Sequence, residues 1–268
     1  MPRNAKSIVL KISGMLVLWA LVMCGPAPLS WGHDNGPDNP LERDMVFIPA
    51  GQFVFGTNQT DSEGLAASMG IPKPLYQDSQ PEQKPFLKGF YIDRHEVTHR
   101  RYRKFLEDLP THPEYQILIE KLGYYAPPQG WQDTRFPEGM ADHPVVWVTW
   151  FDAANFCQWA GKRLPTEAEW ERAARFGRDG ARFIWGDELA PDGRHMANIW
   201  QGDFPHRNTV DDGFTGTAPV KSFPPSPLGL YDLAGNVWEW CQNLYGAPPS
   251  PRVVRGGSFR PEARALST

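Results

Sequence analysis

Hydrophobic residues occur along this chain in short runs, separated by long polar stretches that are rich in glycine and proline. Met45–Ile48 and Gln52–Phe55 lie on either side of the turn signal Pro49-Ala50-Gly51, a pattern that predicts two short strands joined by a turn. The partial alternation over Phe86–Asp93 predicts another strand, and so does the apolar run Val145–Val148. The pattern therefore predicts short strands separated by loops.

Helical periodicity begins after two threonines that can cap a helix. Thr98 precedes a segment whose apolar positions share one helical face, namely Tyr102, Phe105, Leu106 and Leu109. Thr149, with Asp152 three residues later, precedes a second segment with one apolar side, formed by Phe156, Trp159 and Ala160. We expect two helices that each pack an apolar face against the core.

A third helix is predicted directly after the second. Gly161 can adopt the left-handed conformation that ends a helix. Thr166 and Glu169 have the spacing of a capping box, in which each side chain accepts a hydrogen bond from the other residue's backbone. The new helix is expected over residues 167–176, ending at Gly177. The two helices are thus joined by a connection of only a few residues.

Composition supports a loop-rich fold. The chain has 268 residues, with 25 glycines and 27 prolines that favour turns over long elements. Beyond Gly177 the sequence predicts mostly loop until two short strands at Val237–Cys241 and Val253–Val254. Its 11 tryptophans can hold together a domain with little regular structure. One domain over residues 43–268 is the simplest organisation.

Residues 1–32 have the pattern of an export signal. Basic residues precede the mostly apolar run Ile12–Cys24, and Ser30-Trp31-Gly32 offers small residues around a cleavage point. This apolar run is short for a membrane span, so no stable span is expected after cleavage. Residues 33–42 are then a polar linker, and the mature protein is expected to be periplasmic or secreted. A lipoprotein acylated at Cys24 is the alternative.

Charge and cysteine content restrict the partners. The chain has 27 Lys and Arg against 31 Asp and Glu, a net charge of −4. This balance argues against nucleic acid or an anionic membrane, because both bind basic surfaces. After cleavage only Cys157 and Cys241 remain, and a disulfide between them is not expected from sequence alone, because pairing depends on geometry. The oligomeric state is left open.

The run His95-Glu96-Val97-Thr98-His99 matches the H-E-x-x-H pattern of zinc proteases. That chemistry needs both histidines on one helix, a turn apart, so that they face one metal ion. Thr98 is the predicted helix cap, which places His95 before the helix, and no third ligand follows at the usual spacing. We interpret the match as a coincidence, with zinc hydrolysis as the weaker alternative.

Three loop segments carry the oxygen ligands that calcium prefers: Asn198-Ile199, Asp211–Phe214 and Asp232–Glu239. Calcium binds about six to eight carboxylate, amide and backbone oxygens in flexible geometry. The same residue types are also ordinary in turns, so these residues alone leave both interpretations open.

Several motifs occur in an order that resembles the formylglycine-generating enzyme, or sulfatase-modifying factor, family. The motifs are Met45–Gly51, Glu96-Val97-Thr98, Gly161–Glu171, Ala197–Gly202, Asp212–Phe214, Gly216–Val220, Gly229–Trp240 and Arg255-Gly256-Gly257-Ser258. The resemblance implies an α+β fold of the formylglycine-generating enzyme type, related to C-type lectins and low in regular structure. It also implies a protein or peptide substrate, because the family's best-known reaction oxidises a sulfatase cysteine to formylglycine with molecular oxygen and copper.

The resemblance further implies two structural calcium ions. The first would be bound by Asn198, the carbonyl of Ile199, Asp212 and the carbonyl of Phe214. The second would be bound by Asp232, the backbone oxygens of Gly235 and Val237, and Glu239. Trp238 and Ser258 match positions that line the family's active-site cleft, although an aromatic core residue and a turn hydroxyl would fit the same pattern.

The chain departs from the family at the copper site. The two cysteines that hold copper after the Gly-Gly-Ser run would fall on Pro261 and Leu266, so copper is not expected. Family domains usually continue through a further core-closing segment, which makes this chain either a fragment or a natural short form. The hypothesis is an exported sulfatase-modifying-factor-like protein for which the sequence does not support the copper reaction. The alternative is a non-catalytic binding or accessory module on a lectin-like scaffold.

Overall fold

The computed structural model describes residues 44–62, 76–109, 128–203, 206–246 and 251–259, together with two short strands nearer the start, β1 (Ala20–Leu21) and β2 (Gly25–Pro26). Apart from β1 and β2, the predicted export signal and linker lie outside these residues, as do Pro261 and Leu266. The export signal and the identity of the copper positions therefore stay sequence-based predictions.

Two short ribbons form the first half of the domain. Strand β3 (Met45–Ile48) pairs antiparallel with β6 (Phe90–Asp93), and β4 (Gly51–Gln52) pairs antiparallel with β5 (Phe86–Leu87). The single strand expected over residues 86–93 is thus divided, and the strand expected over 52–55 is shorter. The break lies opposite Pro49 and Ala50, where proline has no N–H for a ladder hydrogen bond.

Two further sheets use the later strands. Strand β8 (Trp238–Leu244) pairs antiparallel with β9 (Arg252–Arg255) and parallel with β1. Strand β7 (Lys162–Arg163) pairs antiparallel with β2. The strands predicted at residues 237–241 and 253–254 are therefore confirmed, with β8 extending three residues further and β9 one residue further at each end.

Three α-helices are present among the described residues: α2 (His99–Asp108), α4 (Trp150–Trp159) and α5 (Glu167–Arg175). Each begins at the predicted threonine, and the capping boxes of α4 and α5 are both complete. Gly161 has φ 69° and Gly177 has φ 74°, the left-handed conformation expected at both helix ends. Two short 3-10 helices, η1 (Gln77–Ser79) and η3 (Pro191–Gly193), lie in the loops.

The strand expected over Val145–Val148 is wrong. Trp147 has φ 62°, a left-handed conformation that breaks an extended segment. Val145 still donates a hydrogen bond from its N–H to the carbonyl of Val97 at 2.9 Å. The run is therefore a kinked connection held against the start of α2, with the buried valines pointing into the core.

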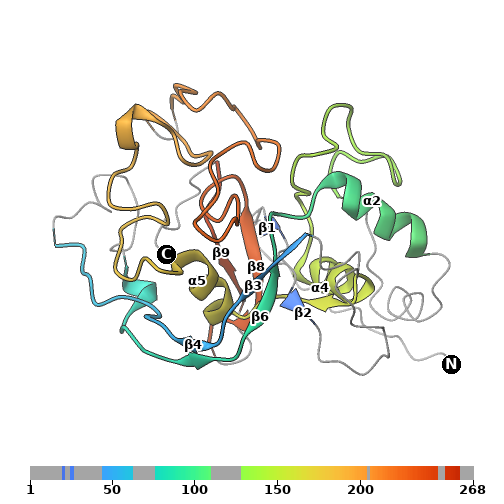
Figure 1. Ribbon diagram of the computed structural model, residues 1–268. Helices are drawn as coiled ribbons and strands as arrows, with labels where there is room; N and C mark the ends of the chain where they lie inside the picture. Colours follow the sequence, from blue (N-terminus) through green and yellow to red (C-terminus); the bar gives the residue numbers. More distant parts are fainter. Residues whose placement is uncertain are drawn as a thin grey trace, which may run out of the picture.

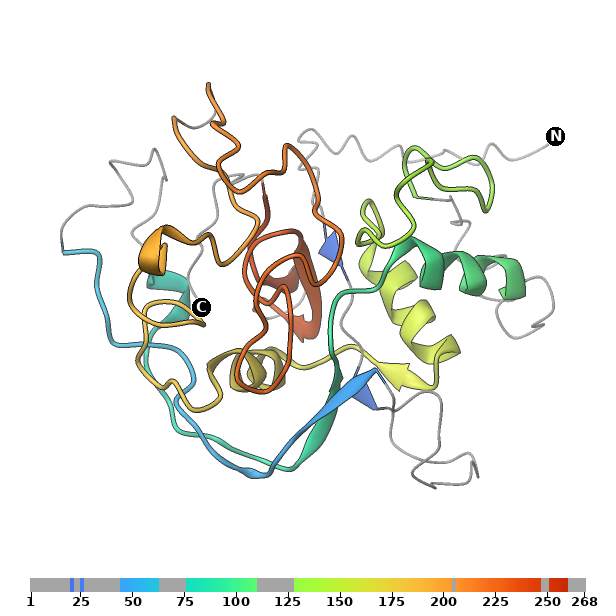
Figure 2. The ribbon, with the colours of Figure 1, turned by 45° about the horizontal axis from the view of Figure 1, so that its top comes forward.

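The core has two apolar clusters. One joins α2 and α4 with Val145, Leu164 and Val237; the other joins β3, β6 and α5 with residues from β8 and β9. Figure 1 shows α2 and α4 together on one side of the β8–β9 pair, with α5 against the pair itself. Turned forward in Figure 2, the long loops between α5 and β8 cover the other side of the domain. No helix among the described residues is both long and apolar enough to cross a membrane.

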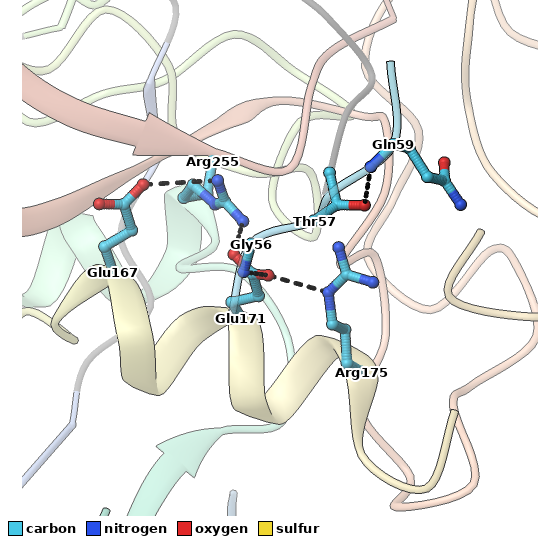
Figure 3. Close-up of polar contacts among 7 residues, drawn as sticks. All are labelled: Gly56, Thr57, Gln59, Glu167, Glu171, Arg175 and Arg255. Carbon is cyan, nitrogen blue, oxygen red and sulfur yellow. Dashed lines mark hydrogen bonds and ion pairs between the residues drawn. The ribbon is translucent and has the colours of Figure 1, made fainter. Parts of the chain in front are cut away.

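A buried carboxylate ties α5 to two distant segments (Figure 3). Glu171 is 1% exposed, and its Oε1 accepts hydrogen bonds from the Gly56 N–H at 2.7 Å and from Arg175 Nε at 2.9 Å. Its Oε2 pairs with Arg255 Nη2 on β9, and Arg255 also reaches Glu167 on α5 at 3.4 Å. Both carboxylate oxygens of Glu171 are therefore matched by donors, as a buried charge requires.

We predict that Glu171→Gln lowers the free energy of unfolding by about 3 kcal/mol, because it removes the buried negative charge between the guanidinium groups of Arg175 and Arg255. Chemical denaturation monitored by tryptophan fluorescence measures this change. The matched control is Glu107→Gln, which breaks the exposed pair between Arg103 and Glu107 and should cost less than about 1 kcal/mol. Equal losses in the two variants would contradict a stabilising role for the Glu171 network.

Candidate functional site

One buried amide joins the loops that carry the predicted calcium ligands. Asn236 is 1% exposed, and its Oδ1 accepts hydrogen bonds from Ala218 N at 2.8 Å and from Asn198 Nδ2 at 3.0 Å. Its Nδ2 donates to Glu96 Oε2 at 2.9 Å and to the Ala218 carbonyl at 3.3 Å. All four hydrogen-bonding positions of this amide are used, so it fixes four segments relative to one another.

The first predicted calcium set is brought together. Asp212 accepts hydrogen bonds from Ile199 N and from Phe214 N, both at 3.0 Å. Gln201 Nε2 donates both to the Ile199 carbonyl and to Asp212 Oδ2, the latter at 2.8 Å. Two of the oxygens predicted to bind calcium thus converge on one positively polarised amide group. The Oδ1 of Asn198 is buried and has no hydrogen-bond partner within the part of the chain that the structure describes.

The second predicted set contains a similar unpaired oxygen. Glu239 is fully buried on β8, and its Oε2 accepts a hydrogen bond from Trp170 Nε1 at 2.8 Å. Its Oε1 has no hydrogen-bond partner among the described residues. A Cβ atom built on Gly256 would lie 3.6 Å from both this Oε1 and the Val237 carbonyl oxygen. Two predicted ligand atoms therefore border the same space beside Gly256, a space that glycine leaves open.

The other members of the second set lie on the adjoining turn. Asp232 is 8% exposed and accepts a hydrogen bond from Lys221 N at 2.8 Å. Gly235 donates its N–H to the Gly256 carbonyl at 2.8 Å. Asp232 has φ 57°, Gly235 φ 75° and Asn236 φ 55°, so the turn uses the left-handed conformation, which Gly, Asn and Asp adopt more readily than other residues.

Burial disfavours negative charge on this side of the domain. It raises the pKa of Glu239 to about 8; a hydrogen bond from Trp170 opposes that shift and Asp232 adds to it. Burial also raises the pKa of Asp232 to about 6, against the backbone hydrogen bond from Lys221. Glu96 has its pKa raised well above the usual value, by burial first and then by Asp232 and Glu239. A cation among these three carboxyl groups would offset both burial and their mutual repulsion.

Glu96 and Asn236 are site residues that sequence reasoning missed. In the sequence, Glu96 stands out only in the H-E-x-x-H match and in the helix entry Glu96-Val97-Thr98, and neither pattern indicates a buried carboxylate beside these loops. No three His, Cys, Asp or Glu side chains among the described residues are close enough together to hold one metal ion. Any cation here must therefore use amide and backbone oxygens as well, as calcium sites do.

Comparison with known proteins settles the family. A model of the "Sulfatase-modifying factor enzyme 1-like domain" matches residues 34–268. The chain belongs to the sulfatase-modifying factor family. Formylglycine-generating enzyme of Mus musculus is 36% identical over 272 residues, which span 85% of this chain and 69% of that enzyme.

The family contains members with different activities. "Inactive C-alpha-formylglycine-generating enzyme 2" of Mus musculus is 34% identical over 277 residues, which span 91% of this chain and 80% of that protein. Among solved structures, that of CarF has a TM-score of 0.51 at 24% identity and covers 85% of this chain and 90% of its own. This likeness confirms the predicted α+β, loop-rich fold of the sulfatase-modifying factor family.

The two cysteines in the described part of the chain differ in their bonding. Cys157 on α4 is disulfide-bonded, whereas Cys241 on β8 is free and fully buried, so these two cysteines do not pair with each other. Burial raises the pKa of the Cys241 thiol well above its usual value. Cys241 is therefore held as a neutral thiol, which is a poor metal ligand.

The two residues that match the family's active-site cleft lie on neighbouring segments. Trp238 is half-buried at the start of β8, and Ser258 is 6% exposed just after β9. Their turns are joined by the Gly235–Gly256 hydrogen bond and by another from Phe259 N to the Asn236 carbonyl at 3.0 Å. The catalytic role of Trp238 and Ser258 stays a prediction.

The H-E-x-x-H run does not have zinc-protease geometry. Helix α2 begins at His99, and His95 precedes it with Nδ1 2.7 Å from the Glu96 carbonyl. His99 is 3% exposed and stacks on Trp131 with ring centroids 5.3 Å apart. Burial first, and then the charge of His143, lower the pKa of His99 to about 4, against an opposing contact with the Pro144 carbonyl. His99 is thus a neutral core residue at pH 7.

We predict that His99 makes the protein acid-sensitive. Its pKa is lower in the folded state than the ordinary 6.5, so its stabilisation is complete above pH 6.5 and is lost as pH falls toward about 4. Replacing it by Phe keeps an aromatic ring against Trp131 but removes the titration. His99→Phe should therefore reduce the loss of unfolding free energy between pH 7 and pH 5, measured by urea denaturation. If the unmodified protein and His99→Phe lose the same unfolding free energy between pH 7 and pH 5, His99 is not the cause of the acid sensitivity.

Proposed function

We propose that this chain is an exported, calcium-stabilised member of the sulfatase-modifying factor family that binds a protein or peptide segment without oxidising a cysteine through copper. The observation that carries the proposal is the state of its thiols. Copper(I) is held by accessible thiolates. Cys157 and Cys241 are both fully buried, burial keeps the Cys241 thiol neutral, and Pro261 and Leu266 stand at the expected copper positions.

Calcium binding is supported by the unpaired oxygens. Asn198, Ile199, Asp212 and Phe214 would hold one ion, and Asp232, Gly235, Val237 and Glu239 would hold the other. The unpaired atoms Asn198 Oδ1 and Glu239 Oε1 are hard oxygen donors, the type that calcium prefers. Calcium would neutralise the buried carboxylates and hold together loops that have little regular structure.

An exposed aromatic surface supports a protein or peptide partner. Phe151 is 58% exposed at the start of α4 and contacts Trp150, with ring centroids 5.3 Å apart. The guanidinium of Arg252 lies over Trp150 at 3.7 Å from its centroid, and Tyr245, 51% exposed, is hydrogen-bonded to the residue before Arg252. Aromatic residues and arginine are enriched in protein interfaces. This surface lies at the β8–β9 end of the domain.

Export is supported by the basic start and apolar run within residues 1–32. The extracytoplasmic location that follows would expose the protein to millimolar-scale calcium, at which even weak calcium sites of extracellular modules are occupied, with dissociation constants of about 0.1 to 1 mM.

We predict that calcium raises the melting temperature of the chelator-treated protein, because binding to the folded state alone stabilises it by about 2.7 kcal/mol at a hundredfold excess over the dissociation constant. Differential scanning calorimetry with and without calcium measures the shift. Asp212→Asn should reduce it by removing a charged ligand. Asp211→Asn makes the same chemical change at the exposed neighbour and should keep the full shift. No shift in the unmodified protein would refute calcium binding.

We also predict binding without turnover. A peptide that spans the modified cysteine of a sulfatase should raise the melting temperature, and copper(I) with oxygen should produce no oxygen consumption and no aldehyde in the peptide. Formylglycine-generating enzyme of Mus musculus serves as the positive control in the same assay.

Phe151→Ala with Tyr245→Ala tests the aromatic surface and should remove the peptide-induced shift. Phe86→Ala is the matched control, since Phe86 is 63% exposed on β5. Copper-dependent oxidation of the peptide would overturn the non-oxidising assignment, and the absence of any peptide-induced shift would overturn the binding assignment for this peptide class.

A further inference from the structure

The two proposed calcium sites are in direct contact. Asn236 lies between Gly235 and Val237 of the second ligand set, and its N–H donates to the carbonyl of Asn198 in the first set at 2.8 Å. Gly235 packs so close to the loop that carries Asn198 that a Cβ atom on Gly235 would collide with the Asn198 carbonyl oxygen. A displacement of either ligand loop would therefore displace the other.

The side chain of Asn236 also sets the orientation of a first-site ligand. Asn198 Nδ2 donates to Asn236 Oδ1 at 3.0 Å and to the Gly216 carbonyl at 2.8 Å. Both N–H groups of that amide are used, so its Oδ1 is the atom left without a partner in the described structure. Rotating the amide of Asn198 would set its oxygen against the Gly216 carbonyl. The two hydrogen bonds therefore fix the amide and leave its oxygen available to a cation.

On its other side Asn236 holds Glu96 beside the second site. Asn236 Nδ2 donates to Glu96 Oε2 at 2.9 Å, and both residues are fully buried. Asn236 has φ 55°, a left-handed conformation that asparagine adopts more readily than most residues. Its direct neighbours in the chain, Gly235 and Val237, are the residues whose carbonyls are predicted ligands of the second site. Asn236 thus contacts ligand residues of both sets.

We propose that Asn236 is a positioning residue shared by the two calcium sites, and that calcium at one site strengthens binding at the other. The proposal rests on the calcium binding proposed above. Ordering the Asn198 loop by a first ion also orders the turn around Asn236, so the second ion has less conformational entropy to lose. Such coupling is reciprocal: each ion must change the affinity of the other by the same factor.

Isothermal titration calorimetry of calcium into the full chain tests the coupling. Asp212→Asn disables the first site and Glu239→Gln the second. We expect each substitution to weaken the remaining site by about fivefold or more, relative to its affinity when the other site is filled. The two factors should agree within error. A remaining site whose dissociation constant stays within about twofold would overturn the coupling.

Asn236→Ala tests the positioning role. Both sites should bind more weakly, and adding Asp212→Asn in this background should no longer change the second site. Asn243→Ala is the matched control, because Asn243 is exposed on β8, away from both ligand sets, and accepts a hydrogen bond from the Glu167 N–H on α5 at 2.8 Å. Coupling that persists at full strength in Asn236→Ala would overturn the assignment to this residue.

The outcomes separate this inference from the calcium proposal. If the unmodified chain binds no calcium, the calcium proposal itself fails. If it binds two ions whose affinities do not depend on each other, calcium binding stands and the coupling is refuted. Should Asn236→Ala fail to fold, the reciprocal effects of Asp212→Asn and Glu239→Gln still decide whether the sites are coupled.

Discussion

The domain depends on the complete hydrogen bonding of one buried amide. Asn236 uses two donors and two acceptor positions to join the start of α2, the Asn198 turn, the Ala218 segment and its own turn before β8. These segments have little regular structure, so few backbone ladders hold them in place. A buried amide that lost one of these partners would cost about 1 to 3 kcal/mol, which makes this arrangement strongly preferred over its alternatives.

The buried carboxylates of this fold fall into two kinds. Glu171 has a donor for each of its oxygens, including Arg175 and Arg255, and needs nothing further. Glu239 and Glu96 each keep one buried oxygen without a hydrogen bond in the described part of the chain. The first kind connects α5 to β9, whereas the second borders the turns predicted to bind calcium. A structural ion pair has a hydrogen-bond donor for each carboxylate oxygen, whereas a candidate cation site keeps a buried oxygen without one. The number of acidic residues does not make this distinction.

Local signals in the sequence predicted local structure well. The capping boxes after Thr149 and Thr166 and the helix end at Gly161 depend on residues within one turn, and all three are confirmed. The strand over Val145–Val148 was wrong because contacts with Val97 and the left-handed Trp147 decide its shape. The predicted calcium ligands came from the family resemblance and stay predictions. The pairing of Asn236 with Glu96 joins residues 140 positions apart, which no local pattern reveals.

Anomalous diffraction from crystals grown in calcium can show whether the unpaired oxygens around Asn236 are cation ligands. If they are, two calcium peaks are expected, one beside Asn198 Oδ1 and Asp212 and the other beside Glu239 Oε1 and the Val237 carbonyl. Crystals that show no anomalous peak at either position, with these oxygens hydrogen-bonded to water or to repositioned side chains instead, would contradict the proposed cation binding.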